Sequence, residues 1–303
     1  MLNPYSERAE WFEMLTRELP DMKIQLWPDI DDPDSVEYAI FWLHDTEDLR
    51  RYPNLRAILA TTAGVEQFAG GDYPDVPIVR MADATMADEM AAYAAHWVVH
   101  FHRKLHTYLD QQAEKAWRPI RATPTGSFPV GILGFGAIGR HIGKCLAVLG
   151  YPVNAWTRTG GEEEGITHFR GRDGLQDMVS ASRAVINVLP HTPETRGLID
   201  ARVLAHFAPG SIYISLGRGA TTIENDLVSA LDEGVLSAAV LDVTETEPLP
   251  ADSPLWDHPR VRITPHTSGF TRAPTAAPLI AANIRRLQRG EPPFPLYDPR
   301  RGY

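Results

Sequence analysis

The sequence predicts an α/β fold made of two Rossmann-like domains, each built around a parallel sheet. Short runs of β-branched and apolar residues alternate with longer segments of helical pattern, which is typical of parallel sheets covered by helices. The chain has 303 residues, a length that favours two hydrophobic cores over one. In the second half, six strand candidates follow one another, as in a doubly wound domain.

The first series of elements precedes residue 90. Its strand candidates are Met22–Leu26, Tyr38–Trp42, Ala57–Thr61 and Val76–Arg80. From Met86 to about Trp117 the chain contains few helix-breaking residues, so we predict one long helix leading into the second domain. The Pro- and Thr-rich segment Arg118–Pro129 is then a connector.

The second series begins after this connector. Its strand candidates are Pro129–Leu133, Pro152–Thr157, Ala184–Leu189, Ser211–Ser215, Ala238–Asp242 and Arg260–Thr264. The closing segment Ala273–Arg289 is predicted to be one more helix, ended by Gly290 and Pro292. We therefore expect a discontinuous first domain of residues 1–90 with 268–303, and a second domain of residues 91–267.

Composition excludes several classes of protein. The formal net charge of -10 argues against nucleic acid or an anionic membrane as a partner. No segment reaches the ~18 consecutive apolar residues of a membrane span, and the N-terminus lacks the layout of a signal peptide. The single Cys145 fits a reducing compartment. The sequence therefore predicts a soluble cytoplasmic protein.

The strongest local motif is the segment Gly134-Phe135-Gly136-Ala137-Ile138-Gly139. It follows an apolar strand candidate and opens a helical segment, which is the context of a dinucleotide-binding loop. Gly134 allows the tight turn, Gly136 lets the backbone approach a pyrophosphate, and Gly139 lets the helix pack against the strand. The N–H groups at the start of that helix, Ala137 and Ile138 included, would face the phosphates.

The end of the next strand indicates which dinucleotide binds. NAD-preferring domains usually carry an acidic residue ~20 residues after the loop, but here Thr157 stands in its place. Arg158 can pair with a 2′-phosphate, and Thr157 and Thr159 can add hydrogen bonds. We predict that NADPH is preferred and that NADH is possible. Two alternatives stay open: Glu162 or Glu163 folds back to the ribose, or Arg158 is a surface charge.

Three ionisable residues follow the last three strand candidates, where open α/β sheets place their ligands. They are Arg218 in Leu216-Gly217-Arg218-Gly219, Glu247 before Pro248, and His266 after Pro265. Any one alone would be unremarkable. Their order behind a dinucleotide loop predicts a catalytic set.

These motifs together resemble the D-isomer-specific 2-hydroxyacid dehydrogenase family, and within it the A-type glyoxylate/hydroxypyruvate reductases. The resemblance covers nearly the whole chain. Besides the glycine loop, it rests on Ala63-Gly64-Val65, Trp156-Thr157-Arg158, Leu189–Gly197, Arg218-Gly219, Asp242–Pro248, Ser253–Trp256, Pro265-His266 and Arg301-Gly302-Tyr303. It implies a flavodoxin-like substrate domain, an active site in the interdomain cleft and a homodimer. The reaction it implies is reduction of a small 2-oxoacid, such as glyoxylate or hydroxypyruvate, to the 2-hydroxyacid.

The resemblance also implies residue roles. His266 would protonate the developing alkoxide, and Glu247 is expected to raise the pKa of that imidazole from about 6.5. Arg218 would pair with the substrate carboxylate. Expected substrate-binding residues are Trp42, Ala63, Gly64, Val65, Arg218 and His266. For Trp42, a position in the hydrophobic core stays open as an alternative. Expected cofactor residues beyond the loop and Thr157, Arg158 and Thr159 are Met86, Leu189, Pro190, Thr195, Leu216, Asp242, Ser268 and Gly269.

Some features leave alternatives open. Ser215 stands where the family commonly has Asn, and Glu245 lies two residues from Glu247. One alternative function is an NAD-dependent dehydrogenase of a bulkier substrate, and another is a non-catalytic dinucleotide-sensing protein. The helical pairs His96 with His100 and His102 with His106 lack the further ligands of a zinc site, so no metal is expected.

Overall fold

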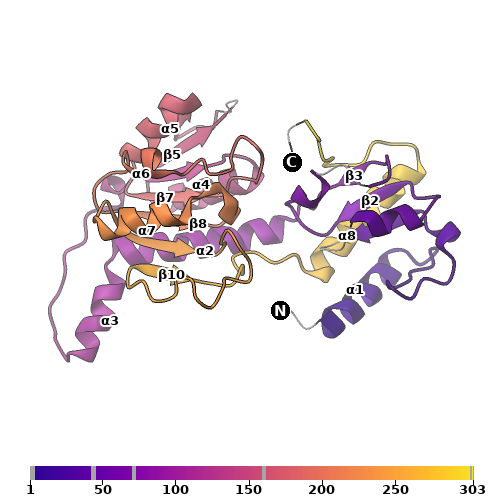
Figure 1. Ribbon diagram of the computed structural model, residues 1–303, viewed down its shortest axis with the longest axis horizontal. Coiled ribbons are helices and arrows are strands. Elements are labelled where there is room, and N and C mark those ends of the chain that lie inside the picture. The colour runs from indigo at the N-terminus through magenta and orange to yellow at the C-terminus, as the bar shows by residue number, and fades with distance from the viewer. Residues whose placement is uncertain (1–3, 42–45, 70–72, 159–161, 301, 303) are drawn as a thin grey trace. The chain divides into compact units, whose positions relative to one another are not determined.

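The computed structural model describes residues 4–41, 46–69, 73–158, 162–300 and 302. Residue contacts divide the chain into two compact units, Met1–Met86 with Phe270–Tyr303, and Ala87–Gly269. Each unit has its own parallel sheet, as the ribbon shows (Figure 1). The predicted α/β class with two parallel sheets is confirmed, and the expected domain boundaries stay a prediction.

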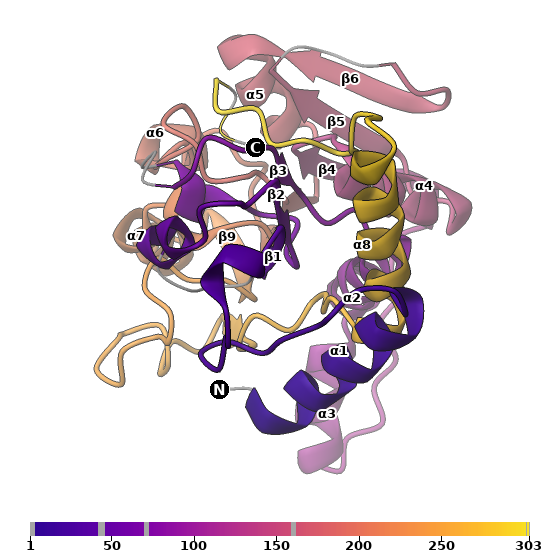
Figure 2. The ribbon, with the colours of Figure 1, turned by 90° about the vertical axis from the view of Figure 1, so that its right-hand side faces the viewer.

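The first unit, called unit 1, has a sheet of three parallel strands in the order β1-β2-β3. These strands are Tyr38–Phe41, Ala57–Ala60 and Ile78–Val79. Helix α1 (Pro4–Glu18) lies beside α8 (Ala273–Gln288), as Figure 2 shows, and their apolar sides share a core with Leu59 and Val79 of the sheet. The chain crosses to the second unit within α2 (Ala84–His102).

The second unit, called unit 2, has seven parallel strands in the order β10-β9-β8-β7-β4-β5-β6. The strands are β4 (Val130–Leu133), β5 (Val153–Thr157), β6 (Ile166–Arg170), β7 (Ala184–Asn187), β8 (Ser211–Ser215), β9 (Leu236–Leu241) and β10 (Val261–Ile263). Four consecutive buried residues form each of β4 and β7, as expected for strands covered on both faces. Because all strands are parallel, their carboxyl ends share one edge of the sheet.

Helices pack on both faces of this sheet. They are α4 (Ala137–Val148), α5 (Gly171–Ser180), α6 (Ala201–Leu204) and α7 (Glu224–Asp232), together with most of α2, whereas α3 (Leu105–Ala113) buries none of its residues. Short 3-10 helices cover Pro33–Ser35, Thr46–Arg51, Glu66–Phe68, Thr125–Ser127 and Gly219–Thr221. Among the described residues, no helix is long and apolar enough to span a membrane.

Two predictions of local structure are wrong, and one strand was missed. Residues 22–26 form no strand, although Met22 and Ile24 pack against the core of unit 1. The long helix predicted over 86–117 is two helices, because the backbone at Lys104 turns into the left-handed region at φ 59°. Strand β6 was not predicted, and it pairs in parallel with β5 at the edge of the sheet.

Candidate active site

The predicted dinucleotide loop joins β4 to α4. Gly134 has φ +94°, a conformation that favours glycine. A Cβ on Gly139 would lie 2.0 Å from the carbonyl oxygen of Gly134, so no side chain fits where the helix meets the turn. The protein's own structure therefore requires both glycines, Gly134 for its backbone conformation and Gly139 for close packing.

Gly136 differs from the other two glycines. Its φ is -78°, and a Cβ there would meet nothing within 4 Å. Neither backbone conformation nor packing requires glycine at this position, which is the N-cap residue immediately before α4. Space is therefore open in front of the helix N-terminus, where N–H groups and the helix dipole favour an anion. This loop fits the pyrophosphate of a dinucleotide.

Thr157 and Arg158 follow as predicted at the carboxyl end of β5, and Thr159 lies outside the described residues. Arg158 Nη1 lies 3.7 Å from Glu194 Oε2, and both side chains are about half exposed. Hydrogen bonds from the Glu194 backbone and from the Thr192 hydroxyl, together with the charge of Arg158, outweigh desolvation and lower the pKa of Glu194. The guanidinium therefore has an ionised partner at neutral pH.

The alternative in which Glu163 binds the ribose is not the arrangement seen here. Its carboxylate lies 2.7 Å from Arg140 Nη1 and 2.9 Å from Lys144 Nζ, both on α4. Hydrogen bonds to these two cations lower the pKa of Glu163. The acidic segment is thus anchored to the helix, and Glu162 lies 3.5 Å from Arg170.

The loop after β7 carries the predicted residues Leu189, Pro190 and Thr195. Leu189 is buried, and its backbone N–H donates to Asn187 Oδ1 at 3.1 Å. The Thr195 hydroxyl donates to the carbonyl of Pro190 at 2.6 Å and accepts the N–H of Thr192 at 2.8 Å. These contacts close the loop into a compact turn at the edge where the glycine loop also lies.

Arg218 lies three residues beyond the end of β8, after the buried Leu216. Its backbone is extended, and its guanidinium donates to the carbonyl of Gly217 at 2.8 Å. Its side chain is half-buried. A Cβ on Gly217 would lie 2.5 Å from the carbonyl oxygen of Leu189, so the turn carrying Arg218 packs directly on the loop after β7.

Asp242, the first residue after β9, is buried at 1% exposure. Its Oδ1 accepts the Thr264 hydroxyl at 2.5 Å and the N–H of Thr267 at 2.8 Å, and its Oδ2 accepts the N–H of Ser268 at 2.9 Å. The Tyr93 hydroxyl of α2 lies 2.6 Å from the Thr264 hydroxyl. Asp242 thus organises the segment that follows β10, including the predicted Ser268 and its neighbour Gly269.

His266 lies within this segment. Its φ of 54° is uncommon for a residue other than glycine, and its N–H donates to the Asp242 carbonyl at 2.8 Å. Its Nδ1 lies 2.8 Å from Glu247 Oε2, while Glu247 Oε1 accepts the N–H of Thr244 at 3.1 Å. Both partners are about two-fifths exposed. Because Glu247 occupies Nδ1, the Nε2 atom is the one left to exchange a proton with a ligand.

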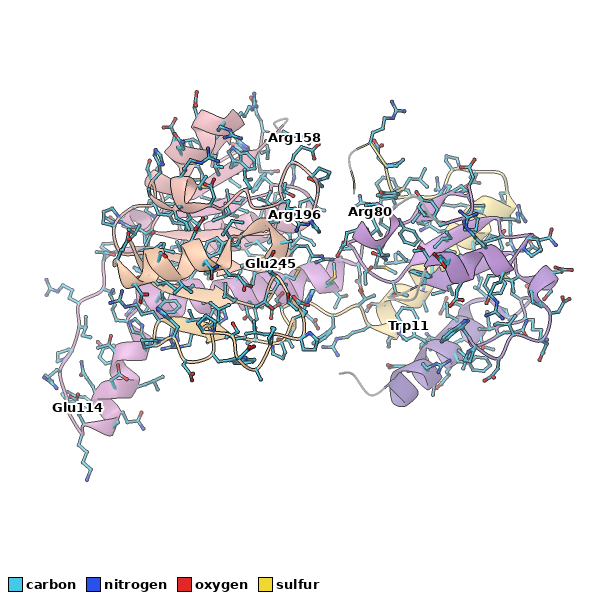
Figure 3. The ribbon with its side chains drawn as sticks, viewed as in Figure 1. Trp11, Arg80, Glu114, Arg158, Arg196 and Glu245 are labelled. Atoms are coloured by element: carbon cyan, nitrogen blue, oxygen red, sulfur yellow. The ribbon has the colours of Figure 1, made fainter. Side chains whose placement is uncertain are left out.

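The charges around Glu247 favour its ionised form. Desolvation raises the pKa of Glu247, but the hydrogen bond and charge of His266, the N–H of Thr244 and the charge of Arg218 outweigh it, and the pKa falls below 4.5. The structure thus brings Arg218, Glu247 and His266 together beyond the neighbouring strands β8, β9 and β10. Figure 3 shows Arg158, Arg196 and Glu245 along the same side of unit 2.

The remaining predicted residues belong to unit 1. Ala63, Gly64 and Val65 form the turn after β2, where the Thr62 hydroxyl donates to the carbonyl of Gly64 at 2.6 Å. Met86, in the first turn of α2, is buried, and its sulfur accepts the Thr271 hydroxyl at 3.9 Å. Trp42 lies outside the described residues. The roles of these residues toward a ligand stay predictions.

The α2 histidines have ordinary structural partners. His102 is buried, with Nδ1 2.9 Å from the Tyr151 hydroxyl and Nε2 2.8 Å from the carbonyl of Thr123. His96 and His100 are ring neighbours at 5.7 Å. No group of three or more His, Cys, Asp or Glu side chains able to hold a metal occurs among the residues that the structure describes.

Three side chains at this edge were not predicted from the sequence: Tyr93, Asn187 and Glu194. Asn187 ends an apolar run, Ala184-Val185-Ile186, and a buried polar residue at a strand end was the available signal. Tyr93 gave no signal, because its contact with Thr264 spans 171 residues of chain.

Residues 95–268 match the family model described as D-isomer specific 2-hydroxyacid dehydrogenase, NAD binding domain. This chain belongs to that family. It is therefore an NAD(P)-dependent 2-hydroxyacid dehydrogenase family enzyme.

Its relatives align over almost the full length. Glyoxylate/hydroxypyruvate reductase A of Serratia proteamaculans is 36% identical, with 99% of this chain and 98% of that protein covered. A family member from Xanthobacter autotrophicus, crystallised with NADPH and MES, is 37% identical at a TM-score of 0.93, covering 97% and 96% of the two chains. The NADPH-dependent glyoxylate/hydroxypyruvate reductase of Sinorhizobium meliloti, crystallised with NADP and sulfate, is 28% identical at 0.92, covering 98% and 96%.

Proposed function

We propose that this enzyme uses NADPH to reduce small 2-oxoacids, such as glyoxylate and hydroxypyruvate, to 2-hydroxyacids. One observation carries the proposal: the 2.8 Å pair of His266 and Glu247 lies with Arg218 at the edge of the sheet that holds the glycine loop. A proton donor and a cation for a carboxylate are the two groups that this reduction requires of the protein. The Serratia and Sinorhizobium relatives carry the same activity in their names.

Each residue of this set has a distinct task. Arg218 binds the substrate carboxylate and draws electron density from the carbonyl. His266 donates the proton on Nε2 to the carbonyl oxygen, and Glu247 holds the ring by Nδ1 and stabilises its charged form. When bound, the nicotinamide supplies the hydride for the carbonyl carbon. The proton and the hydride together convert the 2-oxoacid into the 2-hydroxyacid.

The preference for NADPH rests on the end of β5. Thr157 replaces the acid that would repel a 2′-phosphate, and Arg158 follows it. Arg158 is half exposed, and its pairing with Glu194 at 3.7 Å is loose enough for a phosphate to compete. The Xanthobacter and Sinorhizobium structures contain NADPH and NADP. Turnover of a bulkier 2-oxoacid with NADH would instead favour the alternative dehydrogenase.

The direct test follows nicotinamide absorbance with NADPH or NADH against a panel of 2-oxoacids. We expect turnover of glyoxylate and hydroxypyruvate with NADPH. His266→Ala should lower kcat by about 10²–10⁴-fold and leave NADPH binding, measured by fluorescence, within about twofold of the wild type. If no 2-oxoacid is reduced with either cofactor, this function is wrong.

We also propose that the enzyme is a homodimer. Helix α3 projects from the rest of unit 2 (Figure 1), and its Leu109 is 62% exposed. Trp117, in the segment that returns from α3, is 98% exposed. Exposed apolar surface gathered on one segment is typical of an interaction surface, and a second copy covering this segment would account for both side chains. The proposed location in the cytoplasm rests on the single Cys145 of the sequence.

Light scattering tests the dimer. The double variant Leu109→Ser/Trp117→Ser should be monomeric at concentrations where the wild type is dimeric. Val148→Ser is the matched control, because Val148 is 87% exposed at the end of α4. A monomeric wild type, or a control that dissociates equally, contradicts the assignment.

A further inference from the structure

Asn187 connects two loops of the active-site edge through its side-chain amide. It is the last residue of β7 and is completely buried. Its backbone lies in register with Leu133, before the glycine loop, and with Ser215, before the turn that carries Arg218. The amide therefore lies at the level where three neighbouring strands end.

Every hydrogen-bonding group of this amide except one lone pair has a partner. Its Oδ1 accepts the N–H of Leu189 at 3.1 Å. Its Nδ2 donates to the Tyr213 hydroxyl at 2.7 Å and to the Thr221 hydroxyl at 2.8 Å. A backbone N–H can only donate, so the contact with Leu189 fixes which end of the amide is oxygen.

The Thr221 hydroxyl connects the Asn187 amide to the backbone of Arg218. It donates to the carbonyl of Arg218 at 2.7 Å, while the Tyr213 hydroxyl lies 2.6 Å from that of Thr222. Asn187, Tyr213 and Thr221 have no measurable exposure. Buried hydrogen bonds of this kind hold a unique geometry, because any broken one leaves a polar group without water.

The same two loops also meet directly. The turn at Gly217 packs against the Leu189 backbone, and backbone hydrogen bonds run from Gly197 to Ala220 and from Ile199 to Thr221. We propose that Asn187 is a positioning residue that fixes the Arg218 turn against the Leu189–Pro190 loop, so that binding of the substrate carboxylate depends on the state of this second loop, which is expected to contact the dinucleotide. This inference rests on the proposed function for the ligands of both loops.

Two neighbouring threonines provide a matched test. Thr221→Val removes the hydroxyl that bonds both Asn187 and the Arg218 carbonyl. Thr222→Val removes a neighbouring hydroxyl that is also buried and contacts Tyr213, and Thr221→Ser keeps the hydroxyl at position 221. Asn187→Asp keeps the acceptor for Leu189 and loses both donors. Tm values measured for all four report any general loss of stability.

The kinetic test separates an effect on KM for glyoxylate from an effect on Kd for NADPH. Thr221→Val should raise KM for glyoxylate about fivefold, the effect of one hydrogen bond, and change the NADPH Kd by less than about twofold. Thr221→Ser and Thr222→Val should stay within about twofold of the wild type in both. In the wild type, bound NADPH should strengthen the binding of oxamate, a 2-oxoacid analogue. In Asn187→Asp, this strengthening should be lost. If Thr221→Val and Thr222→Val behave alike, the network is only structural and the proposal is wrong.

Hydrogen exchange decides the positioning role without turnover. Amides of residues 216–222 should exchange faster in Thr221→Val than in Thr222→Val, and exchange in the glycine loop should be equal in the two. A wild type that reduces no 2-oxoacid would overturn the proposed function alone, because this comparison still reports on the Arg218 turn. Equal exchange in the two valine variants would overturn the positioning role, whatever the activity.

Discussion

His266 Nδ1 lies 2.8 Å from Glu247 Oε2, and this contact joins the segment after β10 to the segment after β9. The backbone of His266, at φ 54°, is held by its N–H on the Asp242 carbonyl. Strained backbone of this kind persists only where the surroundings fix it. The histidine is therefore held both at its ring and at its backbone, and these two contacts fix the orientation of its Nε2 atom.

Replacing Glu247 by Gln should slow catalysis far more than it weakens binding. The amide oxygen can still accept the Nδ1–H, but it cannot stabilise the charge of the imidazolium that donates the proton. We expect kcat with glyoxylate to fall about 10–100-fold at neutral pH, with KM for NADPH unchanged. Steady-state rates across pH measure this.

Glu245 provides the control for that experiment. It is exposed, only two residues from Glu247, and its backbone N–H bonds Glu224 at 2.7 Å. Glu245→Gln should therefore keep the wild-type kcat. If Glu245→Gln lost activity while Glu247→Gln kept it, the glutamate that supports His266 would be Glu245 and not Glu247.

The lowered pKa of Glu247 also predicts how stability depends on pH. A carboxylate whose pKa is lower in the folded than in the unfolded protein stabilises the fold above its unfolded pKa, and this contribution is lost as the pH falls through the folded value. The wild type should have a higher Tm than Glu247→Gln at pH values above 4.5, and the difference should shrink at lower pH. A difference that grows as the pH falls below 4.5 would contradict the assigned direction.

The glycines of the dinucleotide loop should separate into two kinds. Gly139→Ala would place a Cβ 2.0 Å from the Gly134 carbonyl, so we expect a loss of about 1–3 kcal/mol in unfolding free energy. Gly136→Ala meets no protein atom within 4 Å, and its stability should change by less than about 1 kcal/mol. NADPH binding should nevertheless weaken about tenfold or more in Gly136→Ala, since the methyl group fills the space for the pyrophosphate.

Urea unfolding and fluorescence titration with NADPH measure the two effects. Tight NADPH binding by Gly136→Ala would mean that the open space at the helix N-terminus does not hold the phosphates.

The fold was predictable wherever a local pattern coincides with its tertiary use. The strands Val130–Leu133 and Ser211–Ser215 were predicted because strands buried on both faces carry uninterrupted apolar residues, here the whole of the first and Ile212-Tyr213-Ile214 in the second. The segment 22–26 has the alternating pattern of a strand but pairs with no other strand, so the strand predicted there does not form. The break at Lys104 contains neither Gly nor Pro, and no local signal marks it.

The site divides in the same way. The glycine loop and the order of Arg218, Glu247 and His266 are visible in sequence because each lies within a few residues of the end of a strand. Contacts that join distant segments are invisible there. The Asn187 amide meets Thr221 across 34 residues, and the Arg158–Glu194 pair depends on how two loops approach.

That pair leads to the last prediction. The Glu194 carboxylate is ionised at neutral pH and lies 3.7 Å from Arg158 Nη1, so it would lie close to a 2′-phosphate bound by that arginine. Removing its charge in Glu194→Gln should lower KM for NADPH about two- to fivefold and leave KM for NADH nearly unchanged. Arg158→Ala should do the reverse and raise KM for NADPH at least about tenfold.

The effect of Glu194→Gln should weaken at high ionic strength, because both side chains are half exposed and salt screens their charges. Glu162→Gln is the matched control, since Glu162 is an exposed acid 3.5 Å from Arg170. It should leave both KM values unchanged. If Glu194→Gln shifts KM for NADPH and NADH equally, the carboxylate acts on the shared part of the dinucleotide and not on the 2′-phosphate.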